Sequence, residues 1–567
     1  MAINVEDLKR QSRGLRGNIR EVLSSGATHF EEPEFQLMKF HGSYQQDDRD
    51  VRNQRKAEGL DKAWQFMVRS KIPGGDLSAE QYLVHDRMAD DLGNRTIRFT
   101  NRQGIQMHGV LFGRLRDCIH RINTCGLTTW GACGDVVRNT VACAVPIHDA
   151  AHLDAQQLAR EISRTFYPAS RGYSEIWLDD QQIAGPPEPE EDPIYGDAYL
   201  PRKFKIGIAV PPHNDVDILS HDVGLAADVR NGVIRGFNVF VGGGFGMSYG
   251  QLKTRPALGQ PLFYIERPHI IEALKAIVTT QRDYGRRDDR KQARLKYVIL
   301  DHGIEWFRER VFERLPVPSA PPRPIEHGST EDMLGWHEQG DGRLFYGVWI
   351  PDGRVADTPR ERYRSALRAI CETIAPRLRI TPNANVYLYG IDPADRGRVD
   401  EILTAHGIAS SETMTRARRM SHACVALPTC GLALAESERV FSTLLSQIDE
   451  ILRELGLAEE PILFRMSGCP NGCARPYNAD FAFVGRSPGK YAIYVGGSHR
   501  GDRLASLLAK SVPFAELASH VRPLLEEFRD NRLEGETFSD FWGRTRPRAE
   551  VTAEQFHLEP AAVAAAS

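Results

Sequence analysis

An internal repeat constrains the fold of this chain more than any other feature of its sequence. Residues 97–110 (IRFTNRQGIQMHGV) align without gaps with residues 378–391 (LRITPNANVYLYGI), and both alternate apolar and polar residues around a turn. Such alternation predicts two short strands in each segment. Upstream, IPGG at 72–75 matches IPDG at 350–353 at nearly the same separation. The chain is therefore expected to fold as two similar halves.

Two further pairs of segments follow in the same order. ACAVP at 142–146 matches ACVALP at 423–428, and VGG at 241–243 matches VGG at 495–497. Four landmarks in one order favour gene duplication over chance similarity of strand-turn-strand segments. The expected fold is α+β, internally duplicated.

Other segments lie outside the repeated elements. Residues 314–328 (RLPVPSAPPRPIEHG) carry five prolines, which predict a linker between the halves. The acidic, proline-rich stretch 185–196 predicts an exposed loop, and the tail 561–567 (AAVAAAS) is expected to fray. Residues 5–25 have the pattern of one amphipathic helix preceding the core.

Composition excludes several classes of protein. The chain has 567 residues, too many for one hydrophobic core, and its 72 basic and 75 acidic residues give no overall attraction to nucleic acid. The sequence contains no run of about 18 apolar residues, so no membrane span is predicted. The N-terminus lacks the apolar core of a secretory signal. We expect a cytoplasmic protein whose thiols stay reduced.

Four of the nine cysteines crowd into one region of the second half. Five residues separate Cys424 from Cys430, and three separate Cys469 from Cys473. The wider gap fits zinc knuckles poorly, whereas four thiolates are what a 4Fe-4S cluster needs. Structural zinc and buried unligated cysteine remain alternatives. The segment 467–476 (SGCPNGCARP) predicts a compact loop whose backbone N–H groups can point at sulfur.

The remaining cysteines carry no such signature and are interpreted as small buried apolar residues. They are Cys118, Cys125, Cys133, Cys143 and Cys371.

The cysteine pattern resembles a known family. Cys424-x5-Cys430 followed by Gly-Cys-Pro-Asn-Gly-Cys at 468–473 is similar to the cluster signature of the siroheme sulfite and nitrite reductases. The resemblance covers nearly the whole chain and is greatest to the hemoproteins of the assimilatory, NADPH-dependent branch. The matching phrases are FHGSYQQDDRD at 40–50, TNRQ at 100–103, YLPRKFK at 199–205, GFNVFVGGG at 236–244 and TTQRDYG at 279–285.

The resemblance implies an architecture, two cofactors and a reaction. It implies ferredoxin-like repeats at 65–131 and 331–406 that pack together, and larger α/β domains that bind siroheme at 132–330 and a 4Fe-4S cluster at 407–567. Residues 1–64 would form an N-terminal extension. The implied reaction is the six-electron reduction of sulfite to sulfide in sulfate assimilation and cysteine biosynthesis. Cys473 would ligate the cluster and also bridge to the siroheme iron.

The family's functional cations also match positions in this chain. The substrate groups fall on Arg69, Arg138, Lys203 and Lys205, of which the lysines would donate protons and the arginines would orient the anion. The implied siroheme contacts are Arg98, Arg102, Gln106, His108, Arg202 and the strip 291–296, where Lys291, Arg294 and Lys296 remain equal candidates, together with Asn471 in the cysteine loop. Any one strip could instead be a solvated charged face, and His108 could be a satisfied core histidine.

The repeat partners of the first strip differ from it. Arg98, Arg102, Gln106 and His108 occupy alternate positions, and their counterparts are Arg379, Asn383, Tyr387 and Tyr389. Loss of the second arginine and of the histidine suggests that only one copy holds the cofactor.

Substrate and electron donor leave alternatives open. The nitrite reductase branch typically has asparagine in place of Lys205, so Lys205 favours sulfite. A cluster protein without a tetrapyrrole is the rival from another class. The sequence contains no GxGxxG fingerprint in strand-turn-helix context, so it is not predicted to bind a dinucleotide. The resemblance implies a separate NADPH-dependent flavoprotein that carries FAD and FMN. Residues 5–25 are a candidate docking element for that flavoprotein. Ferredoxin is the alternative donor, because residues 473–476 (CARP) resemble that branch.

Overall fold

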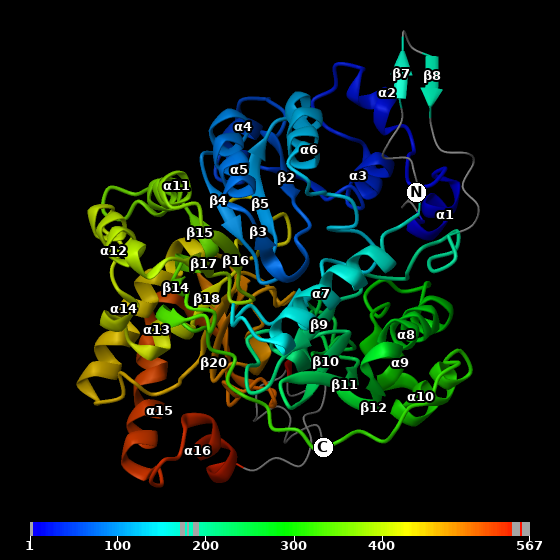
Figure 1. Ribbon diagram of the computed structural model, residues 1–567. Coiled ribbons are helices and arrows are strands. Elements are labelled where there is room, and N and C mark those ends of the chain that lie inside the picture. The colour runs from blue at the N-terminus through cyan, green and yellow to red at the C-terminus, as the bar shows by residue number, and fades with distance from the viewer. Residues whose placement is uncertain (1–3, 170–175, 179–180, 185–191, 547–555, 558–567) are drawn as a thin grey trace.

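The computed structural model describes residues 4–169, 176–178, 181–184, 192–546 and 556–557 (Figure 1). Four five-stranded sheets and one hairpin, β7 (Ile176–Leu178) with β8 (Gln181–Ala184), make up the β structure of this part. The four large sheets form two pairs of the same design. The fold is thus α+β and duplicated, as predicted.

The first pair of sheets contains the repeated segments. One runs β1 (Ser43–Asp47), β2 (Trp64–Arg69), β5 (Ile105–Val110), β4 (Ile97–Phe99) and β15 (Arg354–Val355). The other runs β13 (Gly335–Glu338), β14 (Leu344–Val348), β17 (Val386–Ile391), β16 (Arg377–Ile380) and β3 (Asp76–Leu77). Segments 97–110 and 378–391 therefore form equivalent strand pairs.

Each of these sheets takes its last strand from the other half. β15 pairs with β4 of the first half, and β3 pairs with β16 of the second. Each exchanged strand follows one of the two matched turns, Pro73–Gly75 or Pro351–Gly353. One hydrophobic core includes Leu77, Phe99, Val348 and Leu388, so the two small repeats pack together as predicted.

The second pair of sheets repeats in topology as well. One runs β6 (Val141–Ala142), β9 (Ile206–Ala209), β10 (Val223–Arg230), β11 (Val233–Val241) and β12 (Gln260–Glu266). The other runs β18 (His422–Ala423), β19 (Phe464–Ser467), β20 (Phe481–Ser487), β21 (Lys490–Val495) and β22 (Ser506–Pro513). In both sheets the first three strands run parallel to one another, the fourth is antiparallel to the third, and the fifth is antiparallel to the fourth.

Amphipathic helices cover these sheets. In the first half they are α5 (Ala79–Asp91), α6 (Leu115–Thr124), α7 (Ala150–Thr165), α8 (Ile270–Tyr284), α9 (Leu295–His302) and α10 (Ile304–Phe312). In the second half they are α11 (Tyr363–Thr373), α12 (Arg396–Ala405), α13 (Arg416–Met420), α14 (Glu438–Glu454), α15 (Leu517–Asn531) and α16 (Phe538–Thr545). A capping box at Ser78 and Gln81 fixes the start of α5. No helix in the described ranges is long and apolar enough to cross a membrane.

The single helix predicted over residues 5–25 is wrong. The chain forms α1 (Val5–Gln11) and α2 (Ile19–Leu23), followed by α3 (Glu32–Met38) and later α4 (Arg52–Ala57). Gly14 and Gly17 have positive φ angles of 71° and 51°, which a continuous right-handed helix does not contain. The apolar residues of the sequence keep a helical period across residues 5–25, although a turn at Gly14 and Gly17 interrupts the helix.

The proline-rich linker 314–328 is confirmed, since it forms no helix or strand beyond an isolated bridge at Ala320. Most of the predicted acidic loop and the whole tail, residues 185–191 and 561–567, lie outside the described residues.

Candidate functional site

The two cysteine pairs meet because they follow neighbouring parallel strands. Cys424 comes directly after β18, and Cys469 comes two residues after β19, so both leave the same edge of one sheet. The backbone N–H of Gly468 points at Cys424 Sγ at 3.3 Å. The Gly468 carbonyl accepts hydrogen bonds from Leu434 and Ala435 at 2.8 and 3.1 Å. These contacts join the loop after Cys430 to the loop before Cys469.

Gly468 is required where the two loops touch. A Cβ atom at this position would lie 2.5 Å from Ala426 Cβ and 2.6 Å from the Ala435 carbonyl oxygen. Neither neighbour can move without shifting backbone. Glycine therefore permits the close approach of the two cysteine loops.

The four thiols interact in every pairwise combination. Burial and then the charge of Cys473 raise the pKa of Cys424 and of Cys469 to about 12. The same causes raise the pKa of Cys430 to about 11. Cys424 also interacts with Cys469 and Cys430, and Cys430 with Cys469. Mutually repelling thiolates in a buried site are what a cationic metal centre neutralises.

The spacing of the four thiols bears on the zinc alternative. No three His, Cys, Asp or Glu side chains in the described ranges are close enough to hold a single metal ion. The four thiols interact electrostatically but do not form the compact ligand group that one zinc ion needs. A cluster of several irons suits such a set better.

Two further contacts orient the cysteine loop. Asn471 Nδ2 lies 3.4 Å from Cys469 Sγ, so this predicted cofactor residue touches a predicted cluster ligand. Asn101, in the turn between β4 and β5, donates to the carbonyl oxygen of Cys473. Cys473 is the exposed member of the four, and its charge acts on Lys203 of the first half. It therefore lies where the cysteine loops face the first half.

Predicted cations of the first half gather next to Cys473. Burial, then the charges of Arg202, Arg294 and Arg138, lower the pKa of Lys203 to about 7. Burial, then Arg294, holds the pKa of Lys205 well below its usual value. These interactions join the predicted substrate residues in one positively charged group, whose members are buried or half-buried. Its members are Arg69, Arg102, Arg138, Lys203, Lys205 and Arg294.

One carboxylate organises this group. Asp222 accepts two hydrogen bonds from Arg294 at 2.7 and 2.9 Å and one from the backbone N–H of Lys205 at 2.9 Å. Its side chain is fully buried. Asp222 and Asp135, which interacts with Arg138, are fewer than the six cations of the group, so a positive field remains.

Several buried polar atoms around this group have no hydrogen-bond partner in the part of the chain that the structure describes. They include Nε of Arg69, Nε of Arg102 and both ring nitrogens of His108. Burial, then the charge of Arg354, holds the pKa of His108 well below its usual value. The described residues thus give the His108 ring no hydrogen-bond partner, unlike a core histidine that the protein itself satisfies. Unpaired buried donors are costly unless an acceptor binds them, so the group fits an anion rich in carboxylates.

Other predicted siroheme contacts are occupied within the protein. Arg98 bonds to Glu438 and to the Ala423 carbonyl. Arg202 is held near Asp135 at 3.8 Å, and Lys296 donates to the backbone carbonyls of residues 244, 246 and 255. Lys291 is exposed, which separates it from buried Arg294 and Lys296. Gln106 is buried opposite Arg69 in the pairing of β5 with β2.

Sequence reasoning missed two residues beside the arginines. Arg69 Nη1 lies 3.0 Å from Cys133 Sγ, so Cys133 is more than the apolar filler that was predicted. Tyr44, on β1, interacts with Cys133 and with Arg138. The phrase FHGSYQQDDRD at 40–50 contained Tyr44 as a signal, whereas Cys133 had none. Cys118, Cys143 and Cys371 are buried as expected, and Cys125 is half-buried.

The equivalent site of the second copy is filled by paired side chains. Asn383 binds Asp332 at 2.9 Å, and its amide oxygen accepts from Arg465 and Arg475 at 3.0 and 2.6 Å. Arg379 donates to the Tyr389 hydroxyl at 3.1 Å. Nε of Arg379, Arg465 and Arg475 and Nη1 of Arg465 nevertheless have no hydrogen-bond partner among the described residues, so the restriction of the cofactor to one copy stays a prediction.

Comparison with known proteins gives family matches along the chain. The model of the nitrite and sulphite reductase 4Fe-4S domain matches residues 160–319. The model of the nitrite/sulfite reductase ferredoxin-like half domain matches twice, at 61–124 and 337–406. Residues 160–319 contain no cysteine, so that match identifies the family without locating the cluster ligands.

Curated relatives and a solved structure agree with these matches. The sulfite reductase (NADPH) hemoprotein beta-component of Staphylococcus saprophyticus is 43% identical over 95% of this chain and 94% of its own length. The protein of the same name from Xylella fastidiosa is 42% identical over 96% of each chain. The structure of the Mycobacterium tuberculosis NirA protein matches with a TM-score of 0.76 at 23% identity, covering 96% of this chain and 97% of that one. The structural likeness establishes the fold.

Proposed function

The chain belongs to the nitrite and sulfite reductase family, and on that basis we propose that it is the hemoprotein component of an NADPH-dependent sulfite reductase. The proposed reaction reduces sulfite to sulfide with six electrons. One observation carries the choice of site, namely that the buried cations of the first half lie beside Cys473 of the second. Siroheme and the 4Fe-4S cluster of this family supply electron transfer and an iron that binds the substrate.

Cys424, Cys430, Cys469 and Cys473 are the proposed cluster ligands. Their mutual charge interactions and the N–H donors at Gly468 and Asn471 support this assignment. Donors to sulfur stabilise the more reduced, more negative state of a cluster. Cys473 would also bridge to siroheme, since it is the exposed member and faces the cationic group.

Arg69 and Arg138 would neutralise and orient the anion, because guanidinium groups keep their charge at any physiological pH. Lys203, with its pKa near 7, can both hold a proton and release it at neutral pH. Burial and neighbouring cations hold the pKa of Lys205 well below its usual value. A bound anion favours the charged form of both lysines, so substrate binding would draw protons to the place where reduction consumes them. Proposed siroheme contacts are Arg102, Gln106, His108 and Arg294, whose burial beside this group supports them.

A ferredoxin-dependent sulfite or nitrite reductase is the second candidate. Lys205 supports sulfite, because a more highly charged anion benefits from an additional cation in the site. The NADPH in the names of the relatives supports a separate flavoprotein as electron donor.

Purified protein tests the proposal in two steps. An absorbance spectrum reports siroheme, and sulfide production with a reduced viologen dye reports the reaction without a protein donor. The same assay with NADPH plus a flavoprotein, and then with reduced ferredoxin, identifies the donor. A protein that binds siroheme and reduces nitrite but not sulfite would overturn the proposal.

A further inference from the structure

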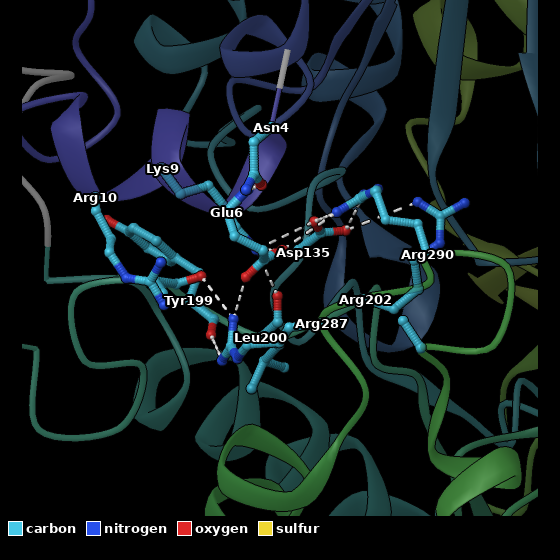
Figure 2. Close-up of polar contacts among 12 residues, drawn as sticks. Asn4, Glu6, Lys9, Arg10, Asp135, Tyr199, Leu200, Arg202, Arg287 and Arg290 are labelled. Carbon is cyan, nitrogen blue, oxygen red and sulfur yellow. Dashed lines mark hydrogen bonds and ion pairs between the residues drawn. The ribbon is translucent and has the colours of Figure 1, made fainter. Parts of the chain in front are cut away.

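The face of the N-terminal helix α1 that carries Glu6 and Lys9 is turned into the protein (Figure 2). Glu6 is 5% exposed and Lys9 only 1%. Lys9 Nζ lies 3.0 Å from the carbonyl oxygen of Leu200, 2.6 Å from Glu6 Oε1 and 3.6 Å from Asp135 Oδ2. A lysine buried this deeply is stable only with such partners. This face of α1 is therefore part of the folded body and does not present a free docking surface.

The partners of Lys9 begin the two segments that carry the proposed substrate cations. Residues 135–138 and 200–204 are joined by three backbone hydrogen bonds of 2.8–3.0 Å. Arg138 ends the first segment, and Lys203 stands on the second. The contacts of Lys9 with Asp135 and Leu200 thus fix the first rung of a short ladder that positions both cations.

Glu6 holds the turn that precedes this ladder. It forms an ion pair with Arg287 and lies 3.5 Å from Arg290. Arg287 donates to the Tyr199 carbonyl oxygen at 2.7 Å. Tyr199 has a φ of +54°, a left-handed conformation that is unfavourable for a residue with a side chain. The contact chain from Glu6 through Arg287 stabilises the bend from which residues 200–204 continue.

The charge balance makes Glu6 hard to replace. Figure 2 shows four basic side chains around two carboxylates, namely Lys9, Arg202, Arg287 and Arg290 around Glu6 and Asp135. Loss of the Glu6 charge leaves Asp135 as the one acid in these ion pairs. The guanidinium groups would then repel one another, and Arg287 would lose its ion pair with Glu6 while keeping its hydrogen bonds to backbone carbonyls at Ala198, Tyr199 and Arg282.

We propose that Glu6 and Lys9 are positioning residues that set how tightly the site binds its anionic substrate. This inference rests on the proposed function. Neither residue touches the substrate. They act through Leu200, Asp135 and Arg287, which keep Lys203 and Arg138 in one geometry.

The test uses the full chain loaded with siroheme and cluster. Glu6→Gln and Lys9→Met are titrated with sulfite by siroheme absorbance, and the reduced proteins are titrated with carbon monoxide, a neutral ligand. The dissociation constant for sulfite should rise about tenfold, because a charge-assisted contact is misplaced, while that for carbon monoxide stays unchanged. KM for sulfite should rise more than kcat falls. Glu6→Asp should recover part of the affinity.

Asp7→Asn is the matched control, since Asp7 lies on the exposed side of α1, with its side chain 55% exposed, and pairs with Arg10 there. It should bind sulfite as the wild type does. Equal loss of sulfite and carbon monoxide binding in Glu6→Gln, or wild-type sulfite affinity in both variants, would overturn the inference. A wild-type protein without siroheme absorbance or sulfite turnover would instead defeat the proposed function.

Hydrogen exchange decides the matter where a variant takes up too little siroheme. In cofactor-free protein, amides of residues 200–204 should exchange about tenfold faster in Glu6→Gln than in wild type, with those of β10 unchanged. Equal exchange in the two proteins would contradict the positioning role.

Discussion

Arg98 of the first half forms an ion pair with Glu438 of the second, and its Nε lies 3.0 Å from Glu438 Oε2. The other Glu438 oxygen, Oε1, lies 2.6 Å from Nη2 of Arg354. Arg98 also donates to the Ala423 carbonyl at 2.9 Å, and the backbone N–H of Glu438 donates to the Cys424 carbonyl at 3.1 Å. The first repeat thus holds the backbone on both sides of a proposed cluster ligand.

Replacing Glu438 with glutamine should lower the iron content of the protein. The change removes the carboxylate that Arg98 and Arg354 share, in a site where their side chains are 8% and 20% exposed. Breaking a buried pair by removing one partner costs about 3–5 kcal/mol. Iron and acid-labile sulfide per chain, together with the midpoint of thermal unfolding, measure the effect.

Arg439→Gln is the control for that experiment. Arg439 lies next to Glu438 in α14 but pairs with Asp50 and Glu436 at the surface, with its side chain 40% exposed. A surface pair contributes about 0–1 kcal/mol, so iron content should not change. Equal iron loss in the two variants would show that Glu438 has no special hold on the cysteine loop.

Gly468→Ala should disrupt the proposed cluster site. The new Cβ would meet Ala426 and the Ala435 backbone at 2.5 and 2.6 Å, so the two cysteine loops must separate. Overpacking of this kind costs about 1–3 kcal/mol. Iron content after anaerobic reconstitution should fall several-fold.

Gly431→Ala tests whether any added methyl group near the cysteines has this effect. Apart from its two chain neighbours, no described residue has an atom within 4 Å of a Cβ at Gly431, and its backbone needs no left-handed conformation. It should reconstitute like the wild type. Normal reconstitution of Gly468→Ala would mean that the loops can separate without losing the cluster.

The duplicated fold could be predicted because its signal is local. Strand alternation and turns occur within segments 97–110 and 378–391, and each segment forms the strands expected. The exchange of β3 and β15 between halves could not be predicted, since two-residue strands leave almost no periodicity. The failure over residues 5–25 has a similar cause, because the apolar period alone does not show where a glycine turn interrupts it.

The candidate site shows the same division. The cysteines were found because metal ligands have characteristic spacing, whereas the contact of Cys133 with Arg69 joins residues far apart in the chain. Arg98 was predicted to bind siroheme because it belongs to a basic strip of the sequence. Its observed partners, Glu438 and Ala423, lie more than 300 residues away and leave no mark in the strip. Residue type indicates that a charge is present, while tertiary pairing decides whether that charge is free.

Sulfite affinity should depend on pH through Lys203. Burial and neighbouring cations lower the pKa of Lys203 to about 7, so the side chain is charged below that pH and neutral above it. Raising the pH therefore removes a positive charge and weakens anion binding. Lys203→Arg keeps its charge throughout the range. The affinity of wild type relative to this variant should fall about tenfold between pH 6 and 8.

The comparison with Lys203→Arg is needed because sulfite itself changes protonation in this range, and that change is common to both proteins. Titration by siroheme absorbance at several pH values gives the ratio. A ratio that stays constant with pH would mean that Lys203 keeps one charge state in the loaded enzyme.

Lys205→Asn should change the preference between sulfite and nitrite. The substitution removes one cationic donor and keeps a polar side chain, so packing changes little. Burial and neighbouring cations hold the pKa of Lys205 well below its usual value, so a bound anion favours the charged form of this side chain, and a more highly charged anion does so more strongly. Loss of this contact costs about 1.5–3 kcal/mol, roughly ten- to a hundredfold in sulfite turnover. Nitrite turnover should fall less or rise.

The ratio of kcat/KM for the two anions, measured with a reduced viologen dye, isolates this effect from the protein donor. Lys490→Asn makes the same chemical change at an exposed position on β21 and should leave the ratio as it is in wild type. Siroheme absorbance must be intact in Lys205→Asn, because loss of cofactor lowers both rates together and leaves their ratio unchanged. An unchanged ratio with intact absorbance would show that Lys205 does not discriminate between the anions. Sulfite would then lose its main support over nitrite among the residues of the site.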